Sequence, residues 1–212
     1  MKEEFLKVIE RCISQLVTDI EKQPLSYYTE RDLHWRLFHL LKGESIFCKD
    51  SALELIHAEF PSINKYSKED REERKRRGHY DLVVWEPESA QKVANLAPWA
   101  TADEILSQTE ILVAVEMKCW EHNVLPTKPN EEMVDWDIRK LADPENKVQY
   151  AYFLNFVRLD FSIDKNRTYY ENLRNYLGEK LREAPSTLKM LCTPVPEWRG
   201  SPIDPEQYWI HR

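Results

Sequence analysis

Two acidic residues and a lysine lie where they could share a hydrolytic site. Glu116 and Lys118 follow the apolar run at 111–115, and because strand side chains alternate, both would project from one face. Asp81 stands at the start of another apolar run, at 80–85. If these two strands pair, carboxylates from neighbouring strands converge beside a lysine.

The charges of such a group indicate its chemistry. Neighbouring carboxylates repel one another unless a cation lies between them, and their hard oxygen atoms suit Mg²⁺ or Mn²⁺. A bound divalent ion can polarise a phosphoryl oxygen and lower the pKa of a bound water, while a lysine can orient that water or neutralise phosphate charge. The pattern therefore indicates hydrolysis of a phosphodiester bond.

The tripeptide Glu-x-Lys is weak support by itself, because it occurs at 73–75, 116–118 and 145–147. Only the copy at 116–118 ends an apolar strand pattern and follows another strand that presents an acid. A purely structural interpretation competes with the catalytic one: Glu116 and Lys118 could form a solvated pair at a strand end, with Asp81 merely starting its strand.

The surrounding segments predict an α/β fold with a mixed central β-sheet flanked by helices. Thr29 and Asp32 can form a variant capping box at the start of one helix. The insertion at 86–110 could hold a short helix, and the last twenty residues, with four prolines, are expected to wrap the surface. The predicted helices cover 3–20, 30–42, 131–143 and 166–183, and the predicted strands cover 53–60, 80–85, 111–117, 148–159 and 188–192.

Composition limits the classes of protein that the chain can represent. Its 212 residues suit one domain, 1–212, and its net charge of −7 gives no overall attraction to nucleic acid. The four cysteines form no CxxC pair, which argues against a zinc knuckle or a disulfide framework. The N-terminus lacks a signal-peptide pattern, and no apolar run approaches the roughly 18 residues of a membrane span. We therefore expect a cytoplasmic protein with no membrane partner.

Asp81 at the start of one strand and Glu116-Met117-Lys118 at the end of the next resemble the PD-(D/E)XK nuclease superfamily. The resemblance covers about 29–159 and implies the restriction-endonuclease-like α-β-β-β-α-β core, here with an N-terminal helix and a C-terminal helix-strand extension. One departure is Tyr80, which occupies the position of the motif's proline.

The resemblance also implies roles for individual residues. It implies metal ligation by Asp81, Glu116 and the main-chain carbonyl of Met117, with Lys118 assisting the attacking water. Many members add an acid from the helix before the first strand, and this role is carried to Glu30. An acid at that position can also simply complement the helix dipole.

Other polar residues have plainer interpretations. His34 and His39 are five residues apart, on different faces of a helix, which favours packing or surface roles over zinc ligation. Asp137 and Lys140 could pair along a helix surface, although Lys140 and Lys147 become candidates for phosphate contact if that helix borders the cleft. The basic run at 74–77 could grip a phosphate backbone or form a solvated loop.

These observations predict a Mg²⁺- or Mn²⁺-dependent nuclease acting through Asp81, Glu116, Lys118 and Glu30. Its partner would be a nucleic acid substrate, DNA in preference to RNA, and a homodimer is compatible with the sequence. The alternative is a non-catalytic α/β module that binds a protein or a nucleic acid through the charged loop at 67–78.

Overall fold

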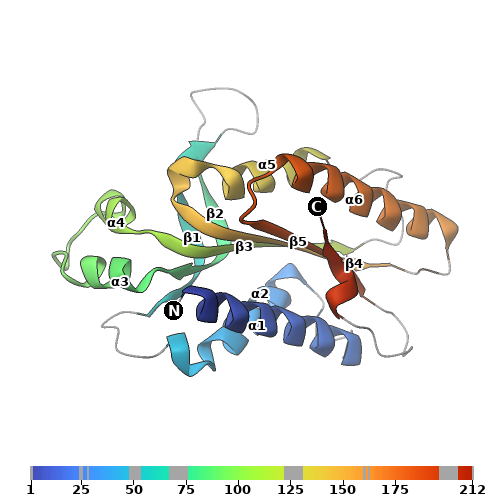
Figure 1. The fold of residues 1–212 in the computed structure, drawn as a ribbon, viewed down its shortest axis with the longest axis horizontal. Coiled ribbons are helices and arrows are strands. Elements are labelled where there is room, and N and C mark those ends of the chain that lie inside the picture. The colour runs from blue at the N-terminus through green and yellow to red at the C-terminus, as the bar shows by residue number, and fades with distance from the viewer. Residues whose placement is uncertain are drawn as a thin grey trace.

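The computed structural model describes residues 2–23, 26–27, 29–47, 54–66, 76–121, 131–159, 161, 163–195 and 205–211. In this part of the chain, six α-helices surround a six-stranded sheet (Figure 1). The helices are α1 (Lys2–Lys22), α2 (Glu30–Lys42), α3 (Pro87–Ala94), α4 (Ala102–Gln108), α5 (Glu131–Ala142) and α6 (Asp164–Glu183). The strands are β1 (Ile56–Tyr66), β2 (Arg76–Trp85), β3 (Ile111–Glu121), β4 (Val148–Arg158), β5 (Leu188–Val195) and β6 (Trp209–Ile210).

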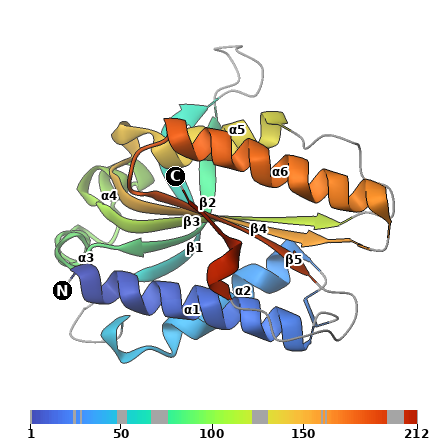
Figure 2. The same cartoon turned by 45° about the vertical axis from the view of Figure 1, so that its right-hand side comes forward.

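The sheet is the middle layer of three. Helices α1 and α2 cover one face and α5 and α6 cover the other, while α3 and α4 lie together at one end (Figures 1 and 2). Each main helix presents an apolar stripe to the sheet, for example Leu33, Leu37 and Leu41 of α2. None of the helices in the described ranges combines the length and apolar character needed to cross a membrane.

The strands follow one another across the sheet in chain order. Strands β1, β2 and β3 form an antiparallel meander, β4 and β5 continue parallel to β3, and β6 pairs antiparallel with β5. Residues 151–157 of β4 are buried on both faces, as the unbroken apolar run predicted for a central strand. The expected α/β class and mixed sheet between helices are confirmed.

Strands β1, β2, β3 and β5 extend beyond the apolar runs that marked them, because the residues beyond those runs still pair with a neighbouring strand. Consequently Asp81 lies inside β2 rather than at its start, and Glu116 lies inside β3 rather than at its end. The insertion at 86–110 holds two helices instead of one. Of the last twenty residues, 209–210 join the sheet as β6, and 196–204 lie outside the described part.

Strands β2 and β3 form a fork in the sheet. Residues 82–85 of β2 pair with residues 111–115 of β3, and the pairing ends at Leu82 and Val115. Beyond that pair, β2 continues against β1, and β3 continues beside β4 to the end of both strands (Figure 2). At the fork, the main-chain groups of β2 and β3 that face each other lack a strand partner and need other hydrogen-bond partners.

The start of α2 has the capping box that the sequence predicted. Asp32 N–H donates to Thr29 Oγ1 over 3.3 Å, and Thr29 N–H donates to Asp32 Oδ2 over 2.7 Å. The Asp32 carboxylate thus caps the helix, whereas the Glu30 carboxylate does not take part in the cap and can contact the sheet.

Thr29→Ala should lower the free energy of unfolding by about 1 kcal/mol, because it removes the acceptor for an otherwise unpaired helix amide. Urea unfolding measures the change, and Thr29→Ser, which keeps the hydroxyl, serves as the control. Equal stability of the alanine variant and the wild type would show that the cap contributes nothing.

Candidate functional site

The four predicted site residues meet at the fork. Asp81 comes from β2, Glu116 and Lys118 from β3, and Glu30 from the first turn of α2. Continuing the antiparallel register by one step beyond the Leu82–Val115 pair places Asp81 opposite Glu116. Lys118 Nζ lies 3.9 Å from Glu30 Oε1, so the helix and the strand are linked by charge.

Main-chain amides of β3 position two of the acids. Met117 N–H donates to Asp81 Oδ2 over 2.6 Å, and Cys119 N–H donates to Glu30 Oε2 over 3.2 Å. Amides two residues apart on a strand point the same way, so both carboxylates fill the place that a paired strand's carbonyls would take. The fork therefore orients the acids as well as exposing them.

Glu30, His34 and Asp81 form a group of possible metal donors. Their carboxylate and imidazole atoms all lie within 4.8 Å of one another. His34 Nε2 is 3.3 Å from Asp81 Oδ2. Glu30 and His34 are four residues apart and share one face of α2, a relation that the comparison of His34 with His39 alone does not reveal.

A second group of charges lies deeper and comes from α5. Lys140 Nζ is 2.6 Å from Glu116 Oε1 and 3.4 Å from Asp137 Oδ1, and it donates to the His79 carbonyl over 2.6 Å. The side chains of Lys140 and Glu116 are only 4% and 2% exposed. Asp137 and Lys140 do pair, as their spacing suggested, but they pair inside the protein against β2 and β3.

Lys118 joins the two groups. Its Nζ is 3.1 Å from Asp137 Oδ2, beyond its contact with Glu30, and it donates to the Met117 carbonyl over 3.2 Å. Lys118 therefore links α2 on one face of the sheet with α5 on the other.

The surroundings shift the pKa values of these groups in different directions. Burial would raise the pKa of Asp81, but the hydrogen bond with His34 and the charges of His34 and Lys118 outweigh it, so the pKa is lowered. Burial raises the pKa of Glu116 well above its usual range, and the charge of Asp81 adds to the rise. Burial also raises the pKa of Glu30.

Lys118 keeps its proton at neutral pH. Burial disfavours its charge, but the nearby carboxylates, Asp137 and Glu30 foremost, raise its pKa above that of an ordinary lysine. Asp81 is thus an ionised acceptor and Lys118 a fixed cation, which suits charge stabilisation better than proton abstraction.

The donor set of Glu30, His34 and Asp81 fits a divalent cation. It offers two carboxylates and an imidazole from a rigid helix and strand, within the mutual distance that one ion can bridge. The set predicted from the resemblance shares Asp81 but uses Glu116 and the Met117 carbonyl, which contact Lys140 and Lys118 respectively.

Other candidates lie elsewhere. Lys147 donates to the Ser107 carbonyl of α4, and the exposed His39 stacks on Trp35 at 5.6 Å between ring centroids. Of the basic run at 74–77, only the backbone of 76 and 77 is described, as part of β2.

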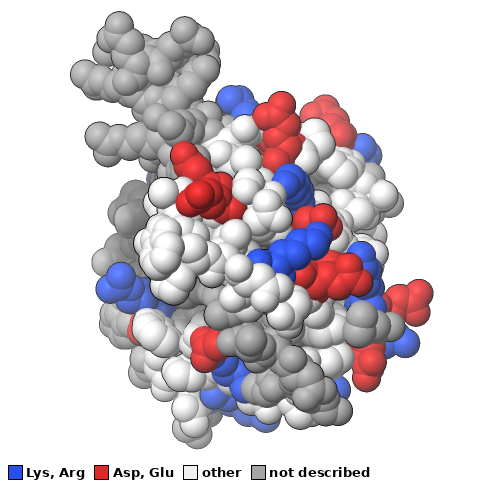
Figure 3. Space-filling view, turned by 90° about the vertical axis from the view of Figure 1, so that its left-hand side faces the viewer, with Lys and Arg blue, Asp and Glu red and all other residues white. Residues whose placement is uncertain are grey.

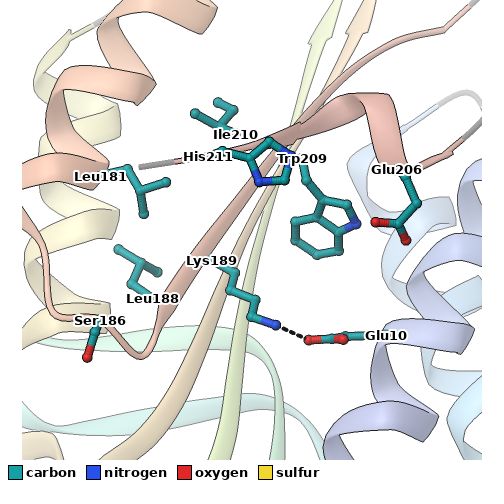
Figure 4. Close-up of a pocket in the computed structure, with 9 residues that line it drawn as sticks. All are labelled: Glu10, Leu181, Ser186, Leu188, Lys189, Glu206, Trp209, Ile210 and His211. Carbon is teal, nitrogen blue, oxygen red and sulfur yellow. Dashed lines mark hydrogen bonds and ion pairs between the residues drawn. The ribbon is translucent and has the colours of Figure 1, made fainter.

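A cavity of about 360 Å³ lies apart from this site, at the β5–β6 edge of the sheet (Figure 4). Apolar side chains, among them Leu181, Leu188 and Trp209, line it, and the Lys189–Glu10 ion pair crosses its floor. Its lining includes none of the charged residues gathered at the fork.

Comparison of the chain with protein-family models, curated proteins and solved structures finds no match.

Lys140→Met should lower the free energy of unfolding by about 3–5 kcal/mol, because it leaves Glu116 buried without its cation. The matched control is Lys189→Met, which removes the half-exposed pair with Glu10 and should cost about 0–1 kcal/mol. Urea unfolding of both variants measures the difference. Similar losses in the two variants would show that Lys140 contributes no more than a surface ion pair.

Proposed function

We propose that this chain is a divalent-metal-dependent nuclease of the PD-(D/E)XK kind, which hydrolyses phosphodiester bonds of DNA in preference to RNA. One observation carries the proposal: Glu30, Asp81, Glu116 and Lys118, from three separate elements, meet at the fork between β2 and β3. A solvated surface pair would not require acids from a helix and a second strand to converge on it.

The order of the elements supports the same family. The order α2, β1, β2, β3, α5 and β4, with α3 and α4 inserted between β2 and β3, is compatible with the α-β-β-β-α-β core that the resemblance implies. In this proposal, α1 is the N-terminal addition, and α6 and β5 are the C-terminal helix-strand extension.

Each residue has a part in the proposed reaction. Asp81, ionised and held by the Met117 amide, is the central metal-binding acid, and Glu30 and His34 lie close enough to share an ion with it. Such an ion would polarise the phosphate and make its bound water more acidic. Lys118, kept protonated by the acids around it, would neutralise charge that develops on the phosphate or orient the water.

Acidic and basic side chains are interspersed on the face shown in Figure 3, consistent with the net charge of −7. Because the net charge of −7 gives no overall attraction to phosphates, the phosphate backbone would be drawn chiefly by the bound ion and the site lysine. The charged loop of the alternative binding-module interpretation lies outside the described residues at 67–75. A cytoplasmic location and a homodimer remain expectations.

The purified protein should cleave at least one member of a panel of labelled DNA and RNA substrates in Mg²⁺ or Mn²⁺, and EDTA should abolish the cleavage. Asp81→Asn and Lys118→Met should each slow cleavage by roughly 10²-fold or more, as expected when a positioned charged group is lost. Gel electrophoresis of the products gives the rates.

Lys180→Met is the matched control for Lys118→Met, because Lys180 pairs with Asp135 on the outer side of α5 and makes no contact with the site acids. It should cleave at the wild-type rate, and circular dichroism should show that all variants are folded. Cleavage that persists undiminished in folded Asp81→Asn protein would rule out this site as the catalytic one.

A further inference from the structure

We propose that the outer side of α2 is a stacking platform for unpaired bases, so that the preferred substrate is a nucleic acid with a single-stranded segment beside the cleaved bond. This aromatic face of α2 consists of Trp35, Phe38 and His39, with Arg31 next to it. The inference deepens the proposed function and rests on it, because it names the substrate class of the same site.

Trp35 is an exposed aromatic residue on a helix whose buried residues face the sheet. It is 55% exposed, whereas the three leucines of the apolar stripe of α2 are buried. A large ring exposed in this way is typical of a surface that binds a partner, because an indole offers a wide area for contact. The packing of α2 on the sheet therefore does not account for Trp35.

Neighbouring rings hold Trp35 in place. His39, one turn along the helix, stacks on it with 5.6 Å between ring centroids and 25° between ring planes. Phe38 makes a T-shaped contact with it at 5.8 Å, and Lys42 Nζ lies 5.4 Å from the centroid of the Phe38 ring. Because these contacts restrict the indole before a ligand arrives, a base that stacks on it loses little affinity to ordering of the side chain.

The aromatic face adjoins the candidate site. Glu30 and His34 lie close to Asp81, and Arg31 and Trp35 directly follow them in the sequence. Each residue of an α-helix turns by about 100° and rises by about 1.5 Å, so Arg31 and Trp35 lie on the adjacent side of the same helix turns. A strand with a phosphate at the fork can therefore place a base on Trp35 within about one or two nucleotides.

The charge beside the rings suits a nucleic acid. Arg31 is exposed in the first turn of α2, where the helix dipole disfavours a cation, so helix stability does not account for it. An arginine next to a stacked base can pair with a phosphate of the same strand. Lys42 pairs with Glu54, so we assign the phosphate contact to Arg31.

Stacking on Trp35 requires a base whose face is uncovered. In a duplex the neighbouring bases cover both faces, whereas a single strand can turn its bases onto aromatic side chains. Such a contact contributes roughly 5- to 150-fold in affinity per base. It would supply binding that the net charge of −7 does not.

Fluorescence anisotropy with labelled oligonucleotides in EDTA tests the platform without cleavage. A single strand of about 12 nucleotides should bind at least about tenfold more tightly than a blunt duplex of the same length. Trp35→Ala should weaken single-strand binding roughly fivefold or more and leave duplex binding unchanged. The matched control is Trp99→Ala, which should bind like the wild type, because Trp99 is 83% exposed but lies between α3 and α4.

Two further variants separate stacking from the phosphate contact. Trp35→Phe keeps a ring and should regain most of the affinity, but it should lose the quenching of tryptophan fluorescence that the single strand causes in the wild type. Arg31→Met should reduce the slope of log affinity against log salt concentration by about 0.7, as expected when one phosphate contact to a single strand is lost.

Three binding results would overturn the inference: no binding of any oligonucleotide, no preference for the single strand, or equal single-strand affinities of Trp35→Ala and Trp99→Ala. Sedimentation supplies a fourth test. Self-association of the wild type that Trp35→Ala abolishes would show that the aromatic face binds a second copy of the chain instead.

The two proposals fail separately. Single-strand binding that depends on Trp35, without cleavage of any nucleic acid in Mg²⁺ or Mn²⁺, would reject the nuclease and leave the platform intact. Cleavage that is equally fast on duplex and single strand, and unchanged in Trp35→Ala, would reject the platform and leave the nuclease intact.

Discussion

The separation of β2 from β3 beyond the Leu82–Val115 pair is the constraint on which the site depends. A strand that loses its partner must satisfy its amides in another way, because a buried unpaired N–H costs about as much as a lost hydrogen bond. Here the amides of Met117 and Cys119 receive the carboxylates of Asp81 and Glu30. At the same gap, Lys118 of β3 contacts Glu30 of α2 and Asp137 of α5, which lie on opposite faces of the sheet.

Charges gathered in such a gap must also balance. Four carboxylates, those of Glu30, Asp81, Glu116 and Asp137, face the two lysines Lys118 and Lys140 in the described structure. Buried charges are tolerated when each has a close partner, and removing one member leaves the other at high cost. Lys140 and Lys118 lie closest to the deeper acids Glu116 and Asp137, whereas Glu30 is 3.9 Å from Lys118.

Much of this architecture could be predicted from local sequence. The apolar runs at 80–85, 111–115 and 148–159 marked the central strands, and Thr29 with Asp32 marked the start of α2. Such signals depend only on neighbours along the chain. Alternation of side chains along β3 was enough to predict that Glu116 and Lys118 share one face. The assumption that β2 pairs with β3 was enough to predict that Asp81 lies near them.

The remaining contacts depend on how the helices pack against the sheet, which no local pattern encodes. Asp137 and Lys140 have the spacing of an ordinary surface pair, and only the packing of α5 over β2 and β3 turns that pair toward Glu116. For His34, a local signal existed in its four-residue spacing from Glu30, but it has meaning only once α2 lies beside Asp81. A motif read along the chain thus identifies acids that could meet in one site, whereas the packing of α2 and α5 decides which charged groups surround those acids.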